Sequence, residues 1–237
     1  MNPHKLAFQV CLFLIIGSLS AEIFLAKSST GRRLAIVVDE RLAALRRTPQ
    51  LNGPLVKRLS RGRKVAVRAS KTTADGTVFL LVNVTTRTHG WIQREAVAAP
   101  TRAGDDRRLL ELINGSNGFD RIARARIFLD NFPRSPLRPQ VLLLLATAAE
   151  EAAAKLSGEA AKRLNGTMTG ARAFTYFLNY TGLDRYNRQR VIFVLDPTKK
   201  RLRYDGAAWR ELVRRYPKSP ESAEARKHLA ELPPISQ

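Results

Sequence analysis

The chain has 237 residues, of which 41 are Lys or Arg and 20 are Asp or Glu, so its formal net charge is +21. A hydrophobic fraction of 44% is ordinary for a folded protein and excludes wholesale disorder. The length is long for one domain and comfortable for two. Such a charge attracts polyanions, for example anionic lipid or acidic wall polymers. The basic residues are spread along the whole chain, however, so a generally basic, solvated surface is the alternative explanation.

The first residues have the pattern of an export signal. A basic start, Met1–Lys5, precedes the apolar run Leu6–Gly17 and the small residues Ser18–Ala21, as in a secretory signal peptide. We therefore expect cleavage after residues 1–21 and a periplasmic or cell-envelope location. Because Glu22–Ala26 resumes the apolar character, an uncleaved anchor in the inner membrane, reaching to about residue 26, is the alternative. The single cysteine, Cys11, lies in this segment, so the cleaved chain has no thiol.

A polar tether over residues 22–41 is expected to lead into an all-β unit over residues 42–98. Its strongest strand is Val78–Val84, whose alternation places Leu80 and Val82 on one face and Phe79 on the other. The pair Asp75-Gly76 before it is a hairpin signal. Five short strands without a helical period predict a small barrel.

The residues of this unit also resemble a known family. Four motifs occur in order: Pro54-Leu-Val-Lys-Arg-Leu59, Arg61-Gly-Arg-Lys-Val65, Phe79-Leu-Leu-Val82 and His89-Gly-Trp-Ile92. This succession resembles the bacterial SH3 (SH3b) domain. The resemblance implies an SH3-like barrel that binds a peptide, with Arg46, Phe79 and Trp91 as its ligand-binding residues. The family usually carries Trp where Phe79 stands, which implies a weakened or retuned surface. Packing in the barrel core is the alternative role of Trp91.

Residues 99–104 have the composition of a linker, and residues 105–237 have a helical apolar period. Helices are expected at residues 105–113, 119–131, 139–157, 170–179, 205–216 and 219–232. A polar turn is expected over Thr181–Arg190. The runs Val191–Leu195 and Arg201–Tyr204 are expected to pair as an inserted β-hairpin.

One motif occurs twice between these helices, as Phe132-Pro-Arg-Ser-Pro136 and Tyr216-Pro-Lys-Ser-Pro220. In each copy the first Pro ends a helix, and the Ser can cap the next helix with Pro at its first position. The pattern resembles the tetratricopeptide repeats of bacterial envelope proteins. That resemblance implies a protein partner, with Phe132 and Tyr216 as interaction residues. With fewer than three repeats, a compact bundle or packing on the barrel is expected.

Residues that would carry catalysis are sparse. After the signal segment only His89 and His228 remain as histidines, and no nucleophile elbow, phosphate-binding loop or metal-ligand spacing occurs. His89 is expected to be a turn residue, and Glu150-Glu151 a solvated pair on a helix. No cofactor, metal or catalytic residue is therefore predicted.

Taken together, the sequence predicts an α+β multidomain protein, with an SH3-like barrel followed by a helical, TPR-like region. The expected function is that of an exported, non-enzymatic cell-envelope adaptor. Its barrel would bind a peptide or peptidoglycan, and its helices a protein partner, while nucleic acid is not an expected partner. A structural or assembly protein that uses the barrel as a spacer is one alternative. A charge-driven binder of anionic envelope polymers is the other.

Overall fold

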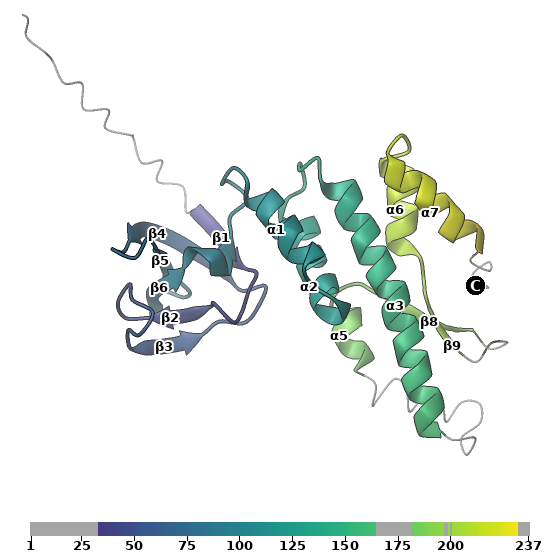
Figure 1. The fold of residues 1–237 in the computed structure, drawn as a ribbon, viewed down its shortest axis with the longest axis horizontal. Coiled ribbons are helices and arrows are strands. Elements are labelled where there is room, and N and C mark those ends of the chain that lie inside the picture. Colours follow the sequence, from purple (N-terminus) through teal and green to yellow (C-terminus); the bar gives the residue numbers. More distant parts are fainter. Residues whose placement is uncertain (1–32, 165–181, 197–198, 200, 232–237) are drawn as a thin grey trace, which may run out of the picture. The chain divides into compact units, whose positions relative to one another are not determined.

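The computed structural model describes residues 33–164, 182–196, 199 and 201–231. The predicted signal peptide with Cys11 and the predicted helix 170–179 lie outside the described residues. The described part is an α+β protein, in which a seven-stranded antiparallel sheet is followed by helices and a two-stranded hairpin (Figure 1). The α+β class expected from the sequence is therefore confirmed.

The sheet has the strand order β3-β2-β6-β5-β4-β1-β7. The strands are β1 (Arg33–Val37), β2 (Ala44–Arg46), β3 (Leu55–Arg58), β4 (Lys64–Thr72), β5 (Val78–Asn83), β6 (His89–Gln93) and β7 (Val97–Ala98). A single 3-10 turn, Arg94–Ala96, separates the last two strands. Strands β2 to β6 therefore correspond to the five strands expected between residues 42 and 98.

The hairpin between β4 and β5 forms where the sequence predicts it. Gly76 has a φ of +81°, a conformation that glycine adopts without the steric cost other residues meet. The Asp75 carboxylate accepts hydrogen bonds from the Thr73 hydroxyl and the Thr77 amide, which closes the turn. Along β5, Leu80 and Val82 point into the sheet core, so the predicted alternation is also confirmed.

The sheet is not closed into the predicted barrel. Its outer strands β3 and β7 have one neighbour each within the described residues, namely β2 and β1. The edge at β7 is covered in another way. Both residues of β7 are fully buried, and Ala98 belongs to the apolar core of the helices that follow. Helices thus cover the edge that a closing strand would occupy in a barrel.

The sheet begins upstream of residue 42, inside the range expected to be a tether. Strand β1 pairs antiparallel with β4 and with β7. The β-branched and apolar run Leu34-Ala-Ile-Val-Val38 favours a strand. Ala35 and Val37 point into the sheet core, whereas Ile36 and Val38 contribute to the helical core. Strand β1 therefore has apolar partners on both of its faces.

Six helices are described after the sheet: α1 (Asp105–Asn114), α2 (Gly118–Asn131), α3 (Arg138–Leu164), α5 (Leu183–Asn187), α6 (Ala207–Arg215) and α7 (Pro220–Glu231). Five of them confirm predicted helices, and α3 extends past its predicted end at residue 157. The sixth, α5, lies where a polar turn was expected over Thr181–Arg190. Its residues Leu183 and Tyr186 are buried in the helical core, which explains why a short helix forms there.

The predicted hairpin insertion is confirmed. Strand β8 (Phe193–Asp196) pairs antiparallel with β9 (Arg201–Tyr204), and Leu202 and Tyr204 on β9 are buried. The Ser157 hydroxyl on α3 accepts a hydrogen bond from the Leu202 amide at 2.8 Å. The Tyr204 hydroxyl accepts one from the Ala208 amide at 2.8 Å. The hairpin is thereby joined to the helices on either side of it in sequence.

Sheet and helices share apolar packing. One core lies within the sheet, and the second is formed by the helices together with Ile36, Val38 and Ala98 from the sheet. The first of the expected linker residues, Ala99, is also buried, and its amide donates to the Asp105 carboxylate at 2.7 Å. The described residues from Arg33 onward accordingly belong to one compact unit.

Candidate functional site

Two of the three predicted ligand-binding residues are direct neighbours in the sheet. Arg46 on β2 is the cross-strand partner of Trp91 on β6. On one side Arg46 is paired with Leu55 of β3, and on the other Trp91 is paired with Leu81 of β5. Directly opposite residues share a face of the sheet. Leu55, Arg46, Trp91 and Leu81 therefore form one transverse row, which we call the Arg46–Trp91 row.

The Arg46–Trp91 row lies on the face opposite the sheet core. The residues next to it in sequence, Leu45, Leu80 and Ile92, point into that core. Arg46, Trp91 and Leu81 are half-buried, and Leu55 is 52% exposed. Trp91 belongs to neither apolar core, so among its two predicted roles the structure leaves it open to contact a ligand.

The Arg46 side chain is held in place within its strand pair. One terminal nitrogen donates to the Gly53 carbonyl at 2.7 Å. In the described part of the chain no carboxylate lies within ion-pair distance of this guanidinium. Its remaining donors are therefore available to an anionic group of a ligand, and a guanidinium can bind a carboxylate through two of them.

Gly90 explains how β2 can approach β6 closely enough to form the row. A Cβ at this position would lie 2.6 Å from the Arg46 carbonyl oxygen and 3.0 Å from the Leu45 Cγ. Only glycine leaves room for this close backbone approach. Gly90 thus allows β2 to lie close to β6, and Trp91 contributes the aromatic surface.

The third predicted ligand-binding residue, Phe79, has a different environment. It lies on the same face as Leu81, and its cross-strand partner Gln93 is two residues from Trp91. Its side chain is only 1% exposed, and it belongs to neither apolar core. A surface ligand would not reach Phe79 directly. Phe79 therefore lies beside the row on the same face of the sheet, as a buried residue.

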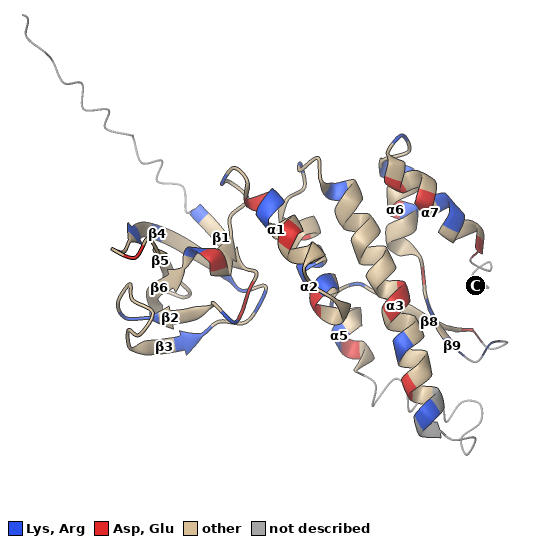
Figure 2. Cartoon of the chain, in the orientation of Figure 1, with Lys and Arg blue, Asp and Glu red and all other residues tan. Residues whose placement is uncertain are grey.

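The segment that contains the row is strongly basic. Residues 44–98 contain eleven Lys and Arg residues against two acids, Asp75 and Glu95. The basic residues are Arg46, Arg47, Lys57, Arg58, Arg61, Arg63, Lys64, Arg68, Lys71, Arg87 and Arg94. Among the described residues only Arg61 of this set forms ion pairs, at 3.1 Å to Glu40 and 2.9 Å to Asp120. Figure 2 shows Lys and Arg in blue at several places on the strands and loops of the sheet.

A buried polar network connects the sheet to α2, and the sequence analysis missed it. The Arg124 guanidinium, 6% exposed, donates to the Val38 carbonyl at 3.2 Å, to the Ser116 hydroxyl and to the Asp39 carboxylate at 3.5 Å. Hydrogen bonding from Arg41, together with the charge of Arg124, holds the pKa of Asp39 below its ordinary value. A second contact of this kind comes from Arg108, whose guanidinium donates to the Glu95 and Val97 carbonyls.

The two predicted protein-interaction residues lie at helix junctions that a single arginine joins. Arg138, 7% exposed at the start of α3, donates to the Leu129 carbonyl at 2.7 Å and to the Tyr216 hydroxyl at 3.1 Å. It also ion-pairs with Glu211 at 3.7 Å. Phe132 is 6% exposed and stacks on Phe128 with 5.2 Å between ring centroids. Both aromatic residues therefore have structural contacts of their own.

The serine of one junction caps a helix as predicted. The Ser219 hydroxyl accepts a hydrogen bond from the Ser222 amide at 3.3 Å, and Pro220 is the first residue of α7. In the other copy the predicted cap is wrong: the Ser135 hydroxyl accepts from the Leu137 amide at 3.3 Å, but α3 begins only at Arg138, so Ser135 and Pro136 lie in the turn before the helix. The repeated motif is thus a repeated helix junction.

Replacing Tyr216 with phenylalanine is expected to lower the free energy of unfolding by about 1 kcal/mol, because the buried Arg138 loses one acceptor. Urea denaturation of the full chain measures this. In an Arg138→Met background the same replacement should have almost no effect, since the hydrogen bond is already gone. Equal losses in both backgrounds would show that the hydroxyl stabilises the protein in some other way.

Glu150 and His228, two of the remaining candidate residues, lie in contact with each other and with Trp209. Glu150, expected to be solvated, accepts a hydrogen bond from the Trp209 indole at 2.7 Å and lies 3.1 Å from His228 Nδ1. The His228 ring stacks on Trp209 with 4.4 Å between centroids. His89 is exposed at the first position of β6. Among the residues that the structure describes, no group of three His, Cys, Asp or Glu could hold a metal ion, and no helix has the length and apolarity to span a membrane.

Comparison of the chain with protein-family models, with curated proteins and with solved structures returns no match.

Proposed function

We propose that this protein is a non-enzymatic adaptor of the bacterial cell envelope, exported by its N-terminal segment. In this proposal the sheet is an SH3-like module that binds an anionic peptide, in a protein or in peptidoglycan. The helical, TPR-like region binds a protein partner. The observation that carries the proposal is the Arg46–Trp91 row, which combines an accessible aromatic ring with a positioned guanidinium that has no carboxylate partner in the described chain.

The chemistry of the row fits peptide recognition. Trp and Arg are the residues that most often dominate the energy of protein interfaces. The indole offers a flat apolar surface, and the adjacent guanidinium offers charge-assisted hydrogen bonds to a carboxylate. The surrounding unpaired basic residues raise the local concentration of an anionic ligand. Recognition would then depend on the Arg46 and Trp91 side chains, and the positive charge of the other basic residues would add a weaker, less specific attraction.

Replacing Trp91 with alanine is expected to reduce retention of the full chain on purified peptidoglycan sacculi by about tenfold, because the aromatic contact is lost. Arg46→Ala should have a similar effect. Arg87→Ala is the matched control, since Arg87 is an exposed basic residue of the β5–β6 turn without an ion-pair partner among the described residues. Circular dichroism melting of each variant reports whether the fold is retained.

The salt dependence separates this function from a charge-driven one. Retention through the row should persist at about 0.15 M salt. At that salt Arg46→Ala should weaken retention more than Arg87→Ala does. If Arg46→Ala and Arg87→Ala weaken retention equally, and retention disappears steeply with salt, the protein is a general polyanion binder. If Trp91→Ala unfolds the protein while Arg46→Ala leaves retention intact, the sheet is a structural spacer.

A further inference from the structure

The two edges of the sheet differ in their accessibility. Strand β7 is buried in both of its residues, and Arg108 of α1 donates to the Val97 carbonyl. Strand β3, at the opposite edge, has β2 as its one neighbour among the described residues, and all four of its residues are exposed. An edge strand presents a row of backbone N–H and C=O groups that a further strand can pair with. Of the two edges of the seven-stranded sheet, the one at β3 offers such a row to a partner.

Apolar side chains gather at this open edge. Five large apolar side chains are exposed among the described residues, and three of them are Leu51 at 52%, Leu55 at 52% and Val56 at 41%. Leu51 lies in the loop before β3, and the other two are its first residues. Exposed apolar residues on an edge strand mark a surface that is buried on binding. The same edge adjoins the Arg46–Trp91 row, because Leu55 is the first member of that row.

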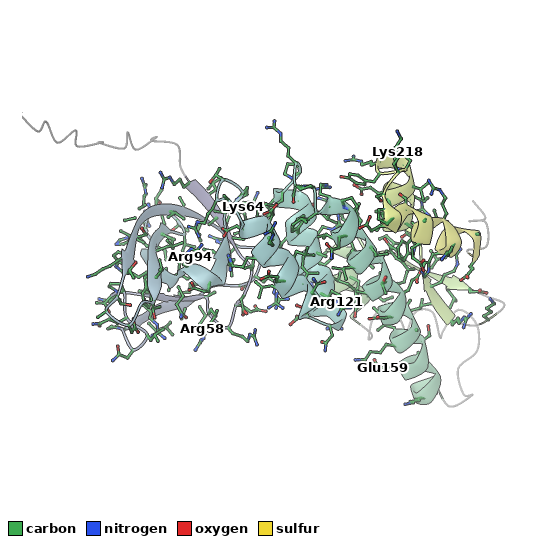
Figure 3. All side chains as sticks on the ribbon, turned by 45° about the horizontal axis from the view of Figure 1, so that its top comes forward. Arg58, Lys64, Arg94, Arg121, Glu159 and Lys218 are labelled. Carbon is green, nitrogen blue, oxygen red and sulfur yellow. The ribbon has the colours of Figure 1, made fainter. Side chains whose placement is uncertain are left out.

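The second half of β3 is basic. Lys57 and Arg58 are exposed, and neither has a carboxylate within ion-pair distance among the described residues. Figure 3 shows the labelled Arg58 side chain extending away from the sheet. Lysine on an edge strand commonly prevents unwanted strand pairing. The positive charges of Lys57 and Arg58 disfavour pairing with a neutral or basic strand. They attract an acidic strand.

A second copy of this chain is a poor occupant of the edge. If two β3 strands paired antiparallel over their whole length, Lys57 and Arg58 of each copy would lie opposite Val56 and Leu55 of the other, so the cations would face apolar side chains and no carboxylate. The net charge of +21 opposes self-association further. Charge complementarity therefore favours an acidic segment of another protein.

We propose that β3 accepts an extended, acidic segment of a partner protein as an additional strand of the sheet. Apolar side chains of the segment would cover Leu55 and Val56, and its carboxylates would pair with Lys57 and Arg58. Backbone hydrogen bonds would supply affinity and the side chains specificity, as in other cases of strand addition. This inference rests on the proposed adaptor function, for which it names the mode of binding and the class of ligand.

Strand addition is tested by fluorescence anisotropy of the full chain with a fluorescent peptide that contains the run Glu-Glu-Val-Val. Paired antiparallel with β3, this order places the glutamates opposite Lys57 and Arg58 and the valines opposite Leu55 and Val56. Two further peptides carry N-methyl groups on one or the other alternate set of residues. Because an added strand bonds to the edge through one set only, one methylated peptide should lose binding and the other should keep it. A peptide with lysine in place of glutamate should not bind.

The protein side of the test uses matched charge reversals. The Lys57→Glu/Arg58→Glu variant is expected to bind the valine–glutamate peptide about tenfold more weakly, since two ion pairs become repulsive. Lys64→Glu/Arg87→Glu changes the net charge equally at exposed positions outside β3 and should have much less effect. Equal effects of the two variants, equal binding of both methylated peptides, or no binding of the parent peptide would each overturn strand addition.

The outcomes also separate this inference from the proposed function. If Trp91→Ala abolishes retention on sacculi while both methylated peptides bind alike, the row binds its ligand and strand addition fails. If the methylated peptides differ while Trp91→Ala and Arg46→Ala leave retention unchanged, the edge is the binding site and the role given to the row fails. If neither the peptides nor the variants discriminate, both proposals fail.

Discussion

Replacing Arg124 with methionine is expected to lower the free energy of unfolding by about 3 kcal/mol, the usual cost of removing one partner from a buried ion pair. The guanidinium has three acceptors from separate parts of the chain, the Val38 carbonyl, the Ser116 hydroxyl and the Asp39 carboxylate. Methionine keeps most of the side-chain volume but satisfies none of these acceptors. The loss would show as a lower midpoint of urea denaturation of the full chain.

Arg41→Met provides the matched control. Arg41 also binds the Asp39 carboxylate, at 2.8 Å, but its side chain is 80% exposed, so water can replace it after substitution. The midpoint should therefore fall much less than in Arg124→Met. If both variants lose the same stability, the buried position of Arg124 has no special role in joining the sheet to the helices.

The same network gives the stability a defined pH dependence. The pKa of Asp39 in the folded protein lies below its ordinary value of about 3.9, chiefly through its hydrogen bond from Arg41. The unfolded chain therefore binds the proton more readily than the folded one. The stabilisation is fully present above the ordinary pKa and is lost as the pH falls through the folded-state pKa. Arg124→Met removes one favourable charge, so the folded-state pKa of Asp39 should move up toward its ordinary value, and less stability should be lost on acidification than in the parent protein.

Replacing Gly90 with alanine is expected to lower the free energy of unfolding by about 2 kcal/mol or more, as overpacking of a tight contact does. The new Cβ would stand 2.6 Å from the Arg46 carbonyl oxygen, which belongs to the backbone of β2 and cannot rotate away. Strand β2 must then move from β6, and Arg46 separates from Trp91. Thermal unfolding and retention on sacculi should both decline in this variant.

Gly158→Ala is the control for this substitution. Gly158 is an exposed residue within α3, and nothing lies within 4 Å of the position of its Cβ. The same chemical change should therefore raise the free energy of unfolding by about 0.8 kcal/mol, because alanine is the better helix former. A stability loss in Gly158→Ala, or none in Gly90→Ala, would contradict the role given to the close β2–β6 contact.

Local patterns predicted most of the secondary structure correctly. The alternation of Val78–Val84 and the turn at Asp75-Gly76 correspond to β5 and the hairpin before it. The aromatic-Pro-basic-Ser-Pro motifs correspond to helix junctions, with Ser219 and Pro220 in the predicted positions. These signals could be read from the sequence because turns, caps and alternation depend on residues close together in the chain.

Features that depend on distant residues could not be predicted in the same way. The sheet edge at β7 is covered by helices, and this prevents a closing strand from pairing there. The burial of Ala98 among those helices cannot be recognised from the residues next to it in sequence. The pairing of Arg124 with Asp39 joins residues 85 positions apart. Arg124 lies on an amphipathic helix between two half-buried arginines, Arg121 and Arg126, and nothing in its sequence context distinguishes it from them.

The candidate site was predicted in part for the same reason. The family resemblance named Arg46 and Trp91, and the structure makes them neighbours. Phe79 was named by its place in the motif, yet its 1% exposure follows from packing that no motif encodes. The open edge at β3 was missed altogether, because the order of strands in a sheet is a property of the whole chain.

The shared packing of Ile36, Val38 and Ala98 has a consequence for the order in which the protein can fold. A chain that leaves the ribosome with its N-terminus first releases every strand of the sheet before α1 and α2. At that stage the three apolar residues have no helices to cover them, and the acceptors Val38 and Asp39 lack Arg124. The sheet therefore reaches its final stability only after α2 has been released and has packed against it.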